Sequence, residues 1–444
     1  MKPYRILSFD GGGSWALIQV RCLQQLFGPD ASGHAVLRQF DLVAANSGGS
    51  IVAAGLAVNY RLSELLALFE NENRRRQVFS ELKWYERIGN QLIRLGARLG
   101  GESLGPKYAT ERKLAGLRDN LAWRDAASHG PEVLVDELPG LIGGDCPVHF
   151  LFCGFDYERR RAVFFRSDKN SRANTHVLGG KPESDFCRVS LVEAVHASTN
   201  APINYFDRPA QVRYRDDEHR YLFWDGAVGG HNNPVKAAVV EALSNGVERE
   251  RIHALSLGTG SLFRPLTRSV PGFDDPILVE PVADPKPSLF TDIPKIAGSI
   301  LNDPPDAATF EAYAMLYPRL PLTTSAAPGN RLVRLNPVIQ PVLRGEGDAR
   351  MWELPEFLKP GGYDEFRRLV EIQMDAVRDE EVAVIRRFCQ AWLDGQAPNQ
   401  GIRWDGELKP VLGYPTFAEA KTAWQNWPGA ASNGAAGTAT ANRS

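Results

Sequence analysis

The first sixty residues alternate between short, mostly apolar runs and segments whose apolar residues recur at helical spacing. Residues 4–9 and 40–45 are mostly apolar and predict two buried strands. Apolar residues at 17, 20, 23 and 26 predict a helix after the first strand, and residues 49–59 predict another after the second. This strand–helix–strand–helix order predicts a parallel sheet that is covered by helices.

The same two patterns continue along the rest of the chain. Residues 261–290 are rich in proline, which indicates an irregular surface loop or an insertion. The remaining expected elements are, in order, mostly helix at 60–130, two strands and a charged turn at 148–167, a helix at 191–199, a strand and Gly-rich turn at 220–230, a helix ending at 246, a strand at 251–260, and helices at 306–317 and 363–395.

Nothing in the composition divides the chain before its C-terminal end. We expect residues 1–400 to form one domain that includes its helical C-terminal part, followed by an extension at 401–427. Residues 428–444 lack large apolar side chains, which predicts a disordered tail.

Composition and charge exclude several classes of protein. The chain has 444 residues, of which 43% are hydrophobic and 23% charged, as in an ordinary globular protein with a large core. Its net charge of −2 gives no global field that would attract nucleic acid. No segment resembles a signal peptide or a transmembrane helix, so we expect a cytoplasmic protein. The five cysteines form no C-x-x-C pair, and no Cys or His spacing predicts a metal site or a cofactor.

Residues 81–100 could bring the protein to a lipid surface. Apolar residues stand at 84, 88, 92, 95 and 99, and arginines lie on other faces of the expected helix. This pattern suits a helix at a membrane interface, which would make the membrane contact peripheral. It is more typical of a helix that faces the core.

Ser47 is the first candidate for chemistry, because Ala45-Asn46-Ser47-Gly48-Gly49 joins a predicted strand to a predicted helix. A Ser in such a tight turn has the geometry of a nucleophile elbow, whose usual pattern is G-x-S-x-G. Small residues two positions before and after the Ser let strand and helix pack closely, and Ala is the next smallest choice after Gly. The alternative is a Ser that only caps the helix, and the local pattern alone does not decide between them.

Three consecutive glycines, Gly11, Gly12 and Gly13, follow the first strand and begin the next helix. Such a run exposes backbone N–H groups, which is typical of a nest that binds a phosphate or the oxyanion of an acyl transfer. The chain lacks the two common nucleotide-binding glycine patterns. A nucleophile and a nest are therefore expected at the carboxyl ends of strands, where open parallel sheets bind ligands.

An activated Ser also needs a base. None of the eight histidines lies beyond residue 253, and only His231 and His253 could follow an acid at Asp225. His253 has the pattern of an inward strand residue. Asp225 itself ends a predicted strand and begins the turn Asp-Gly-Ala, although an isolated Asp before Gly is more typical of a plain turn.

These three segments, in this order, resemble the patatin-like phospholipases: D-G-G-G at 10–13, the elbow at 45–49, and D-G-A at 225–227. HASTNAPINYF, ALSLGTG and NRLVRLNP are similar to further segments of that family. The resemblance covers residues 4–340, continues more weakly to 395, and is consistent with a bacterial member. It implies an α/β fold: a three-layer α/β/α sandwich with a mostly parallel central sheet.

The resemblance also implies a Ser–Asp dyad without a catalytic histidine. Ser47 would be the nucleophile and Asp225 the general base. The N–H groups of Gly11, Gly12, Gly13 and Gly48 would form the oxyanion hole. The implied activity is that of a serine lipid acyl hydrolase, of the phospholipase A or lysophospholipase type, acting on phospholipid or other acyl esters.

Two departures from the family pattern leave alternatives open. Ser14, Trp15 and Ala16 replace the usual x-Arg-Gly after the glycines, so a positive charge near the oxyanion hole is missing. Ala45 replaces the first Gly of the elbow. The alternatives are an acyltransferase or non-lipid esterase that uses the same site, and a weakly active member with a regulatory or binding role. The sequence does not predict the oligomeric state.

Overall fold

The computed structural model describes residues 2–82, 106–124, 130–171, 188–203, 205–215, 217–267, 278, 280–281, 305–317, 330–345, 351–403 and 411–428. The expected helix at 81–100 lies almost wholly outside these residues, as does the tail from 429 onward. Within the described ranges, no helix combines the length and the apolar character needed to cross a bilayer.

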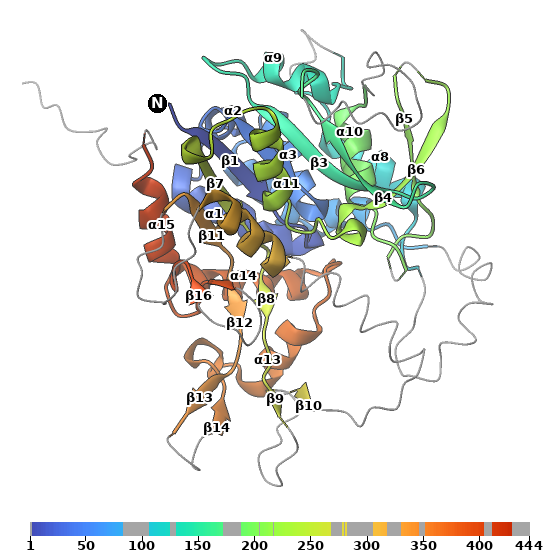
Figure 1. The fold of residues 1–444 in the computed structure, drawn as a ribbon. Coiled ribbons are helices and arrows are strands. Elements are labelled where there is room, and N and C mark those ends of the chain that lie inside the picture. The colour runs from blue at the N-terminus through green and yellow to red at the C-terminus, as the bar shows by residue number, and fades with distance from the viewer. Residues whose placement is uncertain are drawn as a thin grey trace, which may run out of the picture.

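A central sheet of eight strands organises the fold (Figure 1). The pairs from β11 to β3 are all parallel, whereas β4, β5 and β6 pair antiparallel at the other end. The mostly parallel sheet expected from the sequence is thus confirmed. Its strand order is β11 (Leu332–Leu335), β7 (Ile252–Leu257), β1 (Tyr4–Phe9), β2 (Leu42–Ala45), β3 (His149–Asp156), β6 (Arg220–Asp225) and β5 (Ala210–Arg213), with β4 (Arg161–Arg166) also paired to β3.

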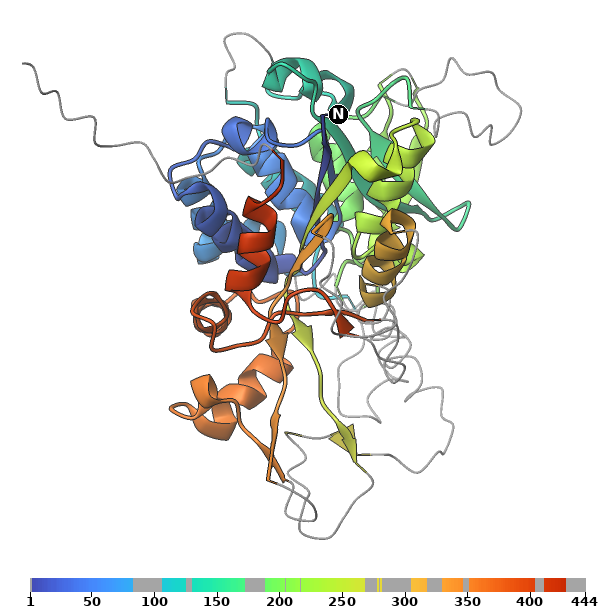
Figure 2. The same ribbon diagram turned by 60° about the vertical axis from the view of Figure 1, so that its left-hand side comes forward.

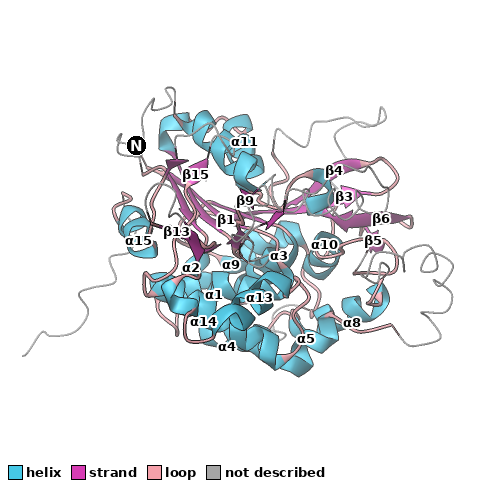
Figure 3. Ribbon diagram, turned by 90° about the horizontal axis from the view of Figure 1, so that it is seen from below, coloured by secondary structure: helices cyan, strands magenta, loops and turns pink. Residues whose placement is uncertain are grey.

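Helices cover both faces of this sheet, which gives the three expected layers (Figure 3). Successive strand residues point to opposite faces, so Leu7 and Phe9 of β1 enter one hydrophobic core and Ile6 enters the other. The smaller core is covered by α11 (Val235–Ser244) and by a helix at 305–316. The larger core is covered by α1 (Leu17–Phe27), α2 (Gly33–Leu37), α3 (Ser47–Ala57), α10 (Leu191–Ser198) and α14 (Asp379–Leu393).

The remaining elements are short or peripheral. Part of the Pro-rich stretch forms strands: β8 (Ser261–Leu262) pairs with β12 (Val338–Ile339), and β9 (Leu266–Thr267) pairs with β10 (Glu280–Pro281). The others are α4 (Leu62–Glu70), α5 (Glu72–Val78), α8 (Thr110–Asn120), α9 (Leu138–Ile142), β13 (Val342–Arg344), β14 (Met351–Glu353), α13 (Gly362–Glu371), β15 (Ile402–Arg403), β16 (Val411–Leu412) and α15 (Phe417–Gln425).

The C-terminal segments pack on the same fold (Figure 2). Trp424 of α15 contacts Phe27 of α1 with ring centroids 5.2 Å apart, and Trp392 of α14 contacts Phe417 at 4.8 Å. The helical pattern expected at 363–395 is two helices, α13 and α14, which are joined by residues 372–378. We call this connection the closing loop, because it covers the site described next.

Candidate active site

The strand register brings Asp225 to Ser47. On β3, Phe152 pairs with Ala45 of β2, and Gly154 pairs with Asp225 of β6. The opposite edge of β3 is occupied by β4 along this whole stretch, so β2 and β6 share one edge and meet end to end. The carboxyl end of β6 therefore faces the carboxyl end of β2, where Ser47 begins α3.

Ser47 has the backbone geometry of a strained elbow. Its φ is +49°, a conformation that residues other than Gly rarely adopt, and its N–H donates to Ser198 Oγ at 3.0 Å. A Cβ at Gly48 would lie 2.5 Å from the carbonyl oxygen of Gly13, so only Gly fits directly after the Ser. Ala45, the departure at the start of the elbow, is fully buried in a regular strand position, where its methyl group packs in the core.

Asp225 is held as a buried carboxylate next to the Ser47 hydroxyl. One of its oxygens accepts the Ala227 N–H and Asn46 Nδ2, both at 2.9 Å. Burial raises the pKa of Asp225, while hydrogen bonds from the Ala227 amide, the Ser47 hydroxyl and Asn46, and the charge of Lys113, lower it in part. A buried carboxylate whose pKa is raised is a stronger proton acceptor than an exposed one.

The glycine loop offers some of the expected donors. The Gly11 N–H already donates to the carbonyl oxygen of Asn232 at 2.8 Å, so it is not available to an oxyanion in this structure. In the parts of the chain that the structure describes, the amides of Gly12 and Gly13 have no acceptor. Gly13 has a φ of +56° and packs against the amide end of α3 through Gly48. Gly12, Gly13 and Gly48 therefore remain as candidate donors.

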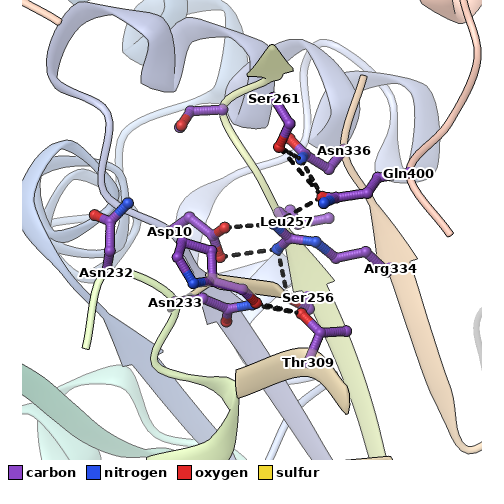
Figure 4. A network of polar contacts seen from close by, with 12 residues as sticks. Asp10, Asn232, Asn233, Ser256, Leu257, Ser261, Thr309, Arg334, Asn336 and Gln400 are labelled. Carbon is purple, nitrogen blue, oxygen red and sulfur yellow. Dashed lines mark hydrogen bonds and ion pairs between the residues drawn. The ribbon is translucent and has the colours of Figure 1, made fainter. Parts of the chain in front are cut away.

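A buried ion pair fixes the start of this loop (Figure 4). Arg334 of β11 donates to both carboxylate oxygens of Asp10, at 2.9 and 2.6 Å, and also to Ser256 Oγ at 2.8 Å. The Asp10 N–H donates to the Leu257 carbonyl oxygen at 3.0 Å. The sequence left the region after the glycines without a positive charge. The fold brings a positive charge from β11 to the start of the loop instead, where it is paired with Asp10.

The closing loop covers the nucleophile. The Ser14 N–H donates to the Met374 carbonyl oxygen at 2.8 Å, and Trp15 Nε1 donates to the Gln373 carbonyl oxygen at 3.2 Å. Trp15, which stands where the family has Arg, is thus a buried anchor for this loop. Ser47 is only 6% exposed and borders a cavity of about 10 Å³ that Met374 also lines. Met374 of the closing loop is therefore one of the residues that enclose Ser47.

Several charged contacts hold the closing loop in place. Asp375 accepts a hydrogen bond from the Tyr108 hydroxyl at 2.6 Å and forms an ion pair with Lys107 at 3.2 Å. Arg75, whose guanidinium is buried, donates through Nε to the Val377 carbonyl oxygen at 2.8 Å. The loop is therefore attached to both α5 and the segment before α8.

A second apolar cavity adjoins the first. Its volume is about 40 Å³, and it shares Gly13, Ile51, Val78 and Phe79 with the cavity at Ser47. Of the other residues that line it, Leu68, Phe69, Leu117 and Leu121 are apolar, and Ser14, Arg74, Arg75 and Asn120 are polar or charged. The two cavities thus share an apolar side at Ile51, Val78 and Phe79.

Sequence reasoning assigned no role to three residues that the fold places around Ser47 and Asp225. Asn46 precedes the nucleophile and contacts Asp225, and its position beside Ser47 was the available signal. Ser198 lies within HASTNAPINYF, whose resemblance to the family carried no assigned role. Lys113 is fully buried and donates to the His196 carbonyl oxygen at 2.9 Å, with further bonds to residues 199 and 200. A lone Lys on a polar helix gave no signal of this.

The two histidines considered as bases have other contacts. His253 Nδ1 lies 2.9 Å from the Arg251 carbonyl oxygen, and the ring of His231 packs against Phe164. Within the described ranges, no histidine hydrogen-bonds Ser47 or Asp225. The same ranges contain no group of three or more His, Cys, Asp or Glu that could hold a metal ion.

Comparison with known proteins gives three similarities. A family model described as patatin-like phospholipase matches residues 7–239, just over half of the chain. A protein named cGAMP-activated phospholipase, from Pseudomonas aeruginosa (strain BWHPSA011 / Pa011), is 27% identical over 231 residues. That match covers 52% of this chain and 54% of the relative, so this chain matches about half of the relative's length. The crystal structure of VipD from Legionella pneumophila matches 88% of this chain and 67% of VipD, but its 11% identity and TM-score of 0.30 carry no argument.

Proposed function

This chain belongs to the patatin-like phospholipase family, and from that premise we propose that it hydrolyses acyl esters of lipids through Ser47 and Asp225. The observation that supports this most strongly is the meeting of the two side chains at the facing ends of β2 and β6. Ser47 has the positive φ of a nucleophile elbow, and its hydroxyl interacts with the Asp225 carboxylate and lowers the pKa of that group in part.

In the first half of the proposed reaction, Ser47 Oγ attacks the carbonyl carbon of the ester while Asp225 takes its proton. The tetrahedral oxyanion is stabilised by the N–H groups of Gly12, Gly13 and Gly48. Collapse of this tetrahedral intermediate breaks the bond between the former carbonyl carbon and the alcohol oxygen. The alcohol leaves with the proton from Asp225. The products of this half are a lysolipid or other alcohol and an acyl-Ser47 ester.

In the second half, Asp225 takes a proton from water as the water oxygen attacks the acyl-Ser47 carbonyl. The second tetrahedral intermediate collapses, the fatty acid leaves, and Ser47 recovers its proton. One residue thus serves as base and then as acid in each half. Loss of a single oxyanion donor typically costs about 3 kcal/mol of transition-state stabilisation.

The apolar lining favours a lipid acyl chain over a polar ester. Ile51, Val78 and Phe79 border both cavities, so an acyl chain attached to Ser47 could extend along them once the closing loop has moved. An acyltransferase would use the same acyl-Ser47 ester with a different acceptor. Because phospholipids are held in a bilayer, we also propose that the protein contacts a membrane peripherally.

The covered nucleophile suits an enzyme that is switched on by a ligand. The relative from Pseudomonas aeruginosa is named for activation by cGAMP. We propose by analogy that this chain also has an inactive state, and that the structure with the closing loop over Ser47 resembles it. Assays of activity should therefore be run both with and without cGAMP.

Labelling with a fluorophosphonate tests the nucleophile directly. In reactions with and without cGAMP, wild type should be labelled at Ser47 in at least one of the two conditions, as located by mass spectrometry of peptides, and Ser47→Ala should not react in either. The exposed Ser63→Ala is the matched control and should label like wild type. Labelling of any other residue, or retention of labelling in Ser47→Ala, would contradict the proposal.

A further inference from the structure

α8, α10 and β5 meet at one end of the sheet (Figure 1), and residues of all three line a third, larger cavity. Its volume is about 630 Å³, which falls within the usual range of about 300–1,000 Å³ for sites that bind small molecules. Ser47, Asp225 and the glycine loop do not line it. The reaction proposed above therefore leaves this cavity without a role.

Arginine dominates the lining of this cavity. Six arginines and three glutamates line it, so the positive charges exceed the negative ones by three. Three of the arginines already have acidic partners: Arg118 with Glu132 at 3.1 Å, Arg208 with Glu111 at 3.2 Å, and Arg188 with Asp136 at 3.0 Å. The other three arginines, Arg213, Arg215 and Arg220, lie on or beside β5 and β6 and account for the excess positive charge.

Within the described ranges, these three arginines lack acidic partners. Arg213 of β5 and Arg215 have no side-chain partner there, although both line the cavity. Arg220 of β6 pairs across the hairpin with Arg213, and in the same ranges its one side-chain hydrogen bond is to the neutral oxygen of Gln211, at 2.9 Å. Three guanidinium groups are thus gathered on one wall, where their mutual repulsion favours a bound anion.

The inner wall of the cavity carries a buried polar atom for which the described ranges offer no partner. His196 of α10 lines the cavity and is 1% exposed, and within those ranges no group hydrogen-bonds its Nδ1. The backbone carbonyl oxygen of His196 accepts a hydrogen bond from Lys113 Nζ. A buried polar atom without a partner is costly, so a change that gives Nδ1 of His196 a partner would be favourable.

We propose that this cavity binds a free phosphate ester of about nucleotide size, and that α10 conveys its binding to the nucleophile. Guanidinium groups bind phosphate oxygens in bidentate pairs and also stack on flat heterocycles. The volume of about 630 Å³ is that of a site for a whole small molecule, which favours a soluble phosphate ester over the headgroup of a lipid in a bilayer.

The geometry of α10 connects the two sites. At its amide end and along one face, Ser190, Glu193 and His196 line the cavity. Its last residue, Ser198, accepts the N–H of Ser47 at 3.0 Å. A ligand that shifts α10 must therefore change the support of the nucleophile. This step rests on the proposed function, whereas binding to the cavity does not.

Calorimetric titration tests the binding, with ATP and inorganic pyrophosphate as probes and Ser47→Ala as the protein. Both probes should bind, and Arg213→Glu combined with Arg215→Glu should weaken binding about tenfold or more, since charge-assisted bonds are lost. The matched control combines Arg344→Glu with Arg368→Glu, two exposed arginines outside the cavity, and should bind like the parent.

We call Arg213→Glu combined with Arg215→Glu the cavity variant. Three results would contradict the binding site: neither probe binds, the control loses as much affinity as the cavity variant, or the cavity variant loses no affinity. Binding only to vesicles that contain phosphatidylglycerol, with loss in the cavity variant, would assign the arginines to a membrane instead. Melting temperatures of all variants show that each is folded.

A separate experiment tests whether ligand binding in the cavity affects Ser47 through α10. The rate at which fluorophosphonate labels Ser47 should change when ATP is added to wild type, and should not change in the cavity variant. An unchanged rate at saturating ATP would refute the connection. Failure of wild type to label at all would instead contradict the proposed function, while the titration would still decide the binding site.

Discussion

Arg334→Met should destabilise the protein strongly at neutral pH, because it leaves the charge of Asp10 buried and alone. The two side chains are 2% and 4% exposed and share two hydrogen bonds, one of which is 2.6 Å long. Removing one partner of a buried pair typically costs about 3–5 kcal/mol of unfolding free energy. Met fills most of the space of the Arg stem, so a cavity adds little to this cost.

The loss of unfolding free energy caused by Arg334→Met should increase with pH. Burial raises the pKa of Asp10, and only the charge and the hydrogen bonds of Arg334 lower it. The pKa of Asp10 in the folded protein is above the ordinary value of 3.8. Ionisation of Asp10 therefore lowers the free energy of unfolding as the pH rises from 3.8 to the folded pKa. Arg334→Met raises the folded pKa further. The difference between wild type and variant should therefore grow with pH and be smallest in acid.

Unfolding in urea at about pH 5 and about pH 7.5 measures this difference. The double variant Asp10→Asn with Arg334→Met has no buried charge and should be more stable than Arg334→Met alone at the higher pH. A loss below about 1 kcal/mol at the higher pH would refute the reasoning. It would equally be refuted by a double variant that is no more stable than the single one.

Three further changes test the neighbourhood of the dyad. Gly13→Ala places a Cβ 2.2 Å from a backbone carbonyl oxygen at a φ of +56°, so both the melting temperature and the hydrolysis rate should fall. Gly362→Ala is the control, because it has a φ of +60° but open space, and it should cost only about 1–2 kcal/mol in urea unfolding. Trp15→Arg restores the usual family residue but buries a cation, so it should lower the melting temperature without raising esterase activity. A more active variant would contradict this. Lys113→Met should move the acid limb of the pH–rate profile to higher pH, because the charge of Lys113 lowers the pKa of Asp225. An unmoved or lowered limb would refute that role.

The layered fold could be predicted because its signals are local. Buried strands such as β1 and β2 are short apolar runs, and the helices between them show their period directly in the sequence. The motifs shared with the family are local too, so Ser47 and Asp225 could be assigned to strand ends from the sequence alone. The structure brings those two side chains together, and their chemical roles remain a proposal.

The pairing that brings the dyad together could not be predicted. The sequence predicts a mostly parallel sheet but not which strands are antiparallel, and β6 is antiparallel to β3 and meets β2 end to end. Apolar periodicity describes each strand alone and does not encode which edge another strand will occupy. The register between Gly154 and Asp225 joins positions far apart in the chain, so no local pattern could reveal it.

Two other features depend on the same kind of distant contact. The Gly11 N–H is occupied by the carbonyl oxygen of Asn232, although its place in a glycine run suggested a free donor. The closing loop contacts the glycines although it lies beyond residue 370. The apolar periodicity of α13 and α14 did not show that a loop separates them or that this loop lies at the site. Both features arise from tertiary contacts of the backbone, which side-chain patterns do not report.

Release of fatty acid from mixed phospholipid vesicles tests the central claim most directly. Wild type, Ser47→Ala and Asp225→Asn should be compared with and without cGAMP, beside the exposed Asp30→Asn as the matched control. The account predicts release by wild type and by the control, and a loss of about a thousandfold or more in both dyad variants. Release by Ser47→Ala or Asp225→Asn at a rate close to that of wild type would contradict it.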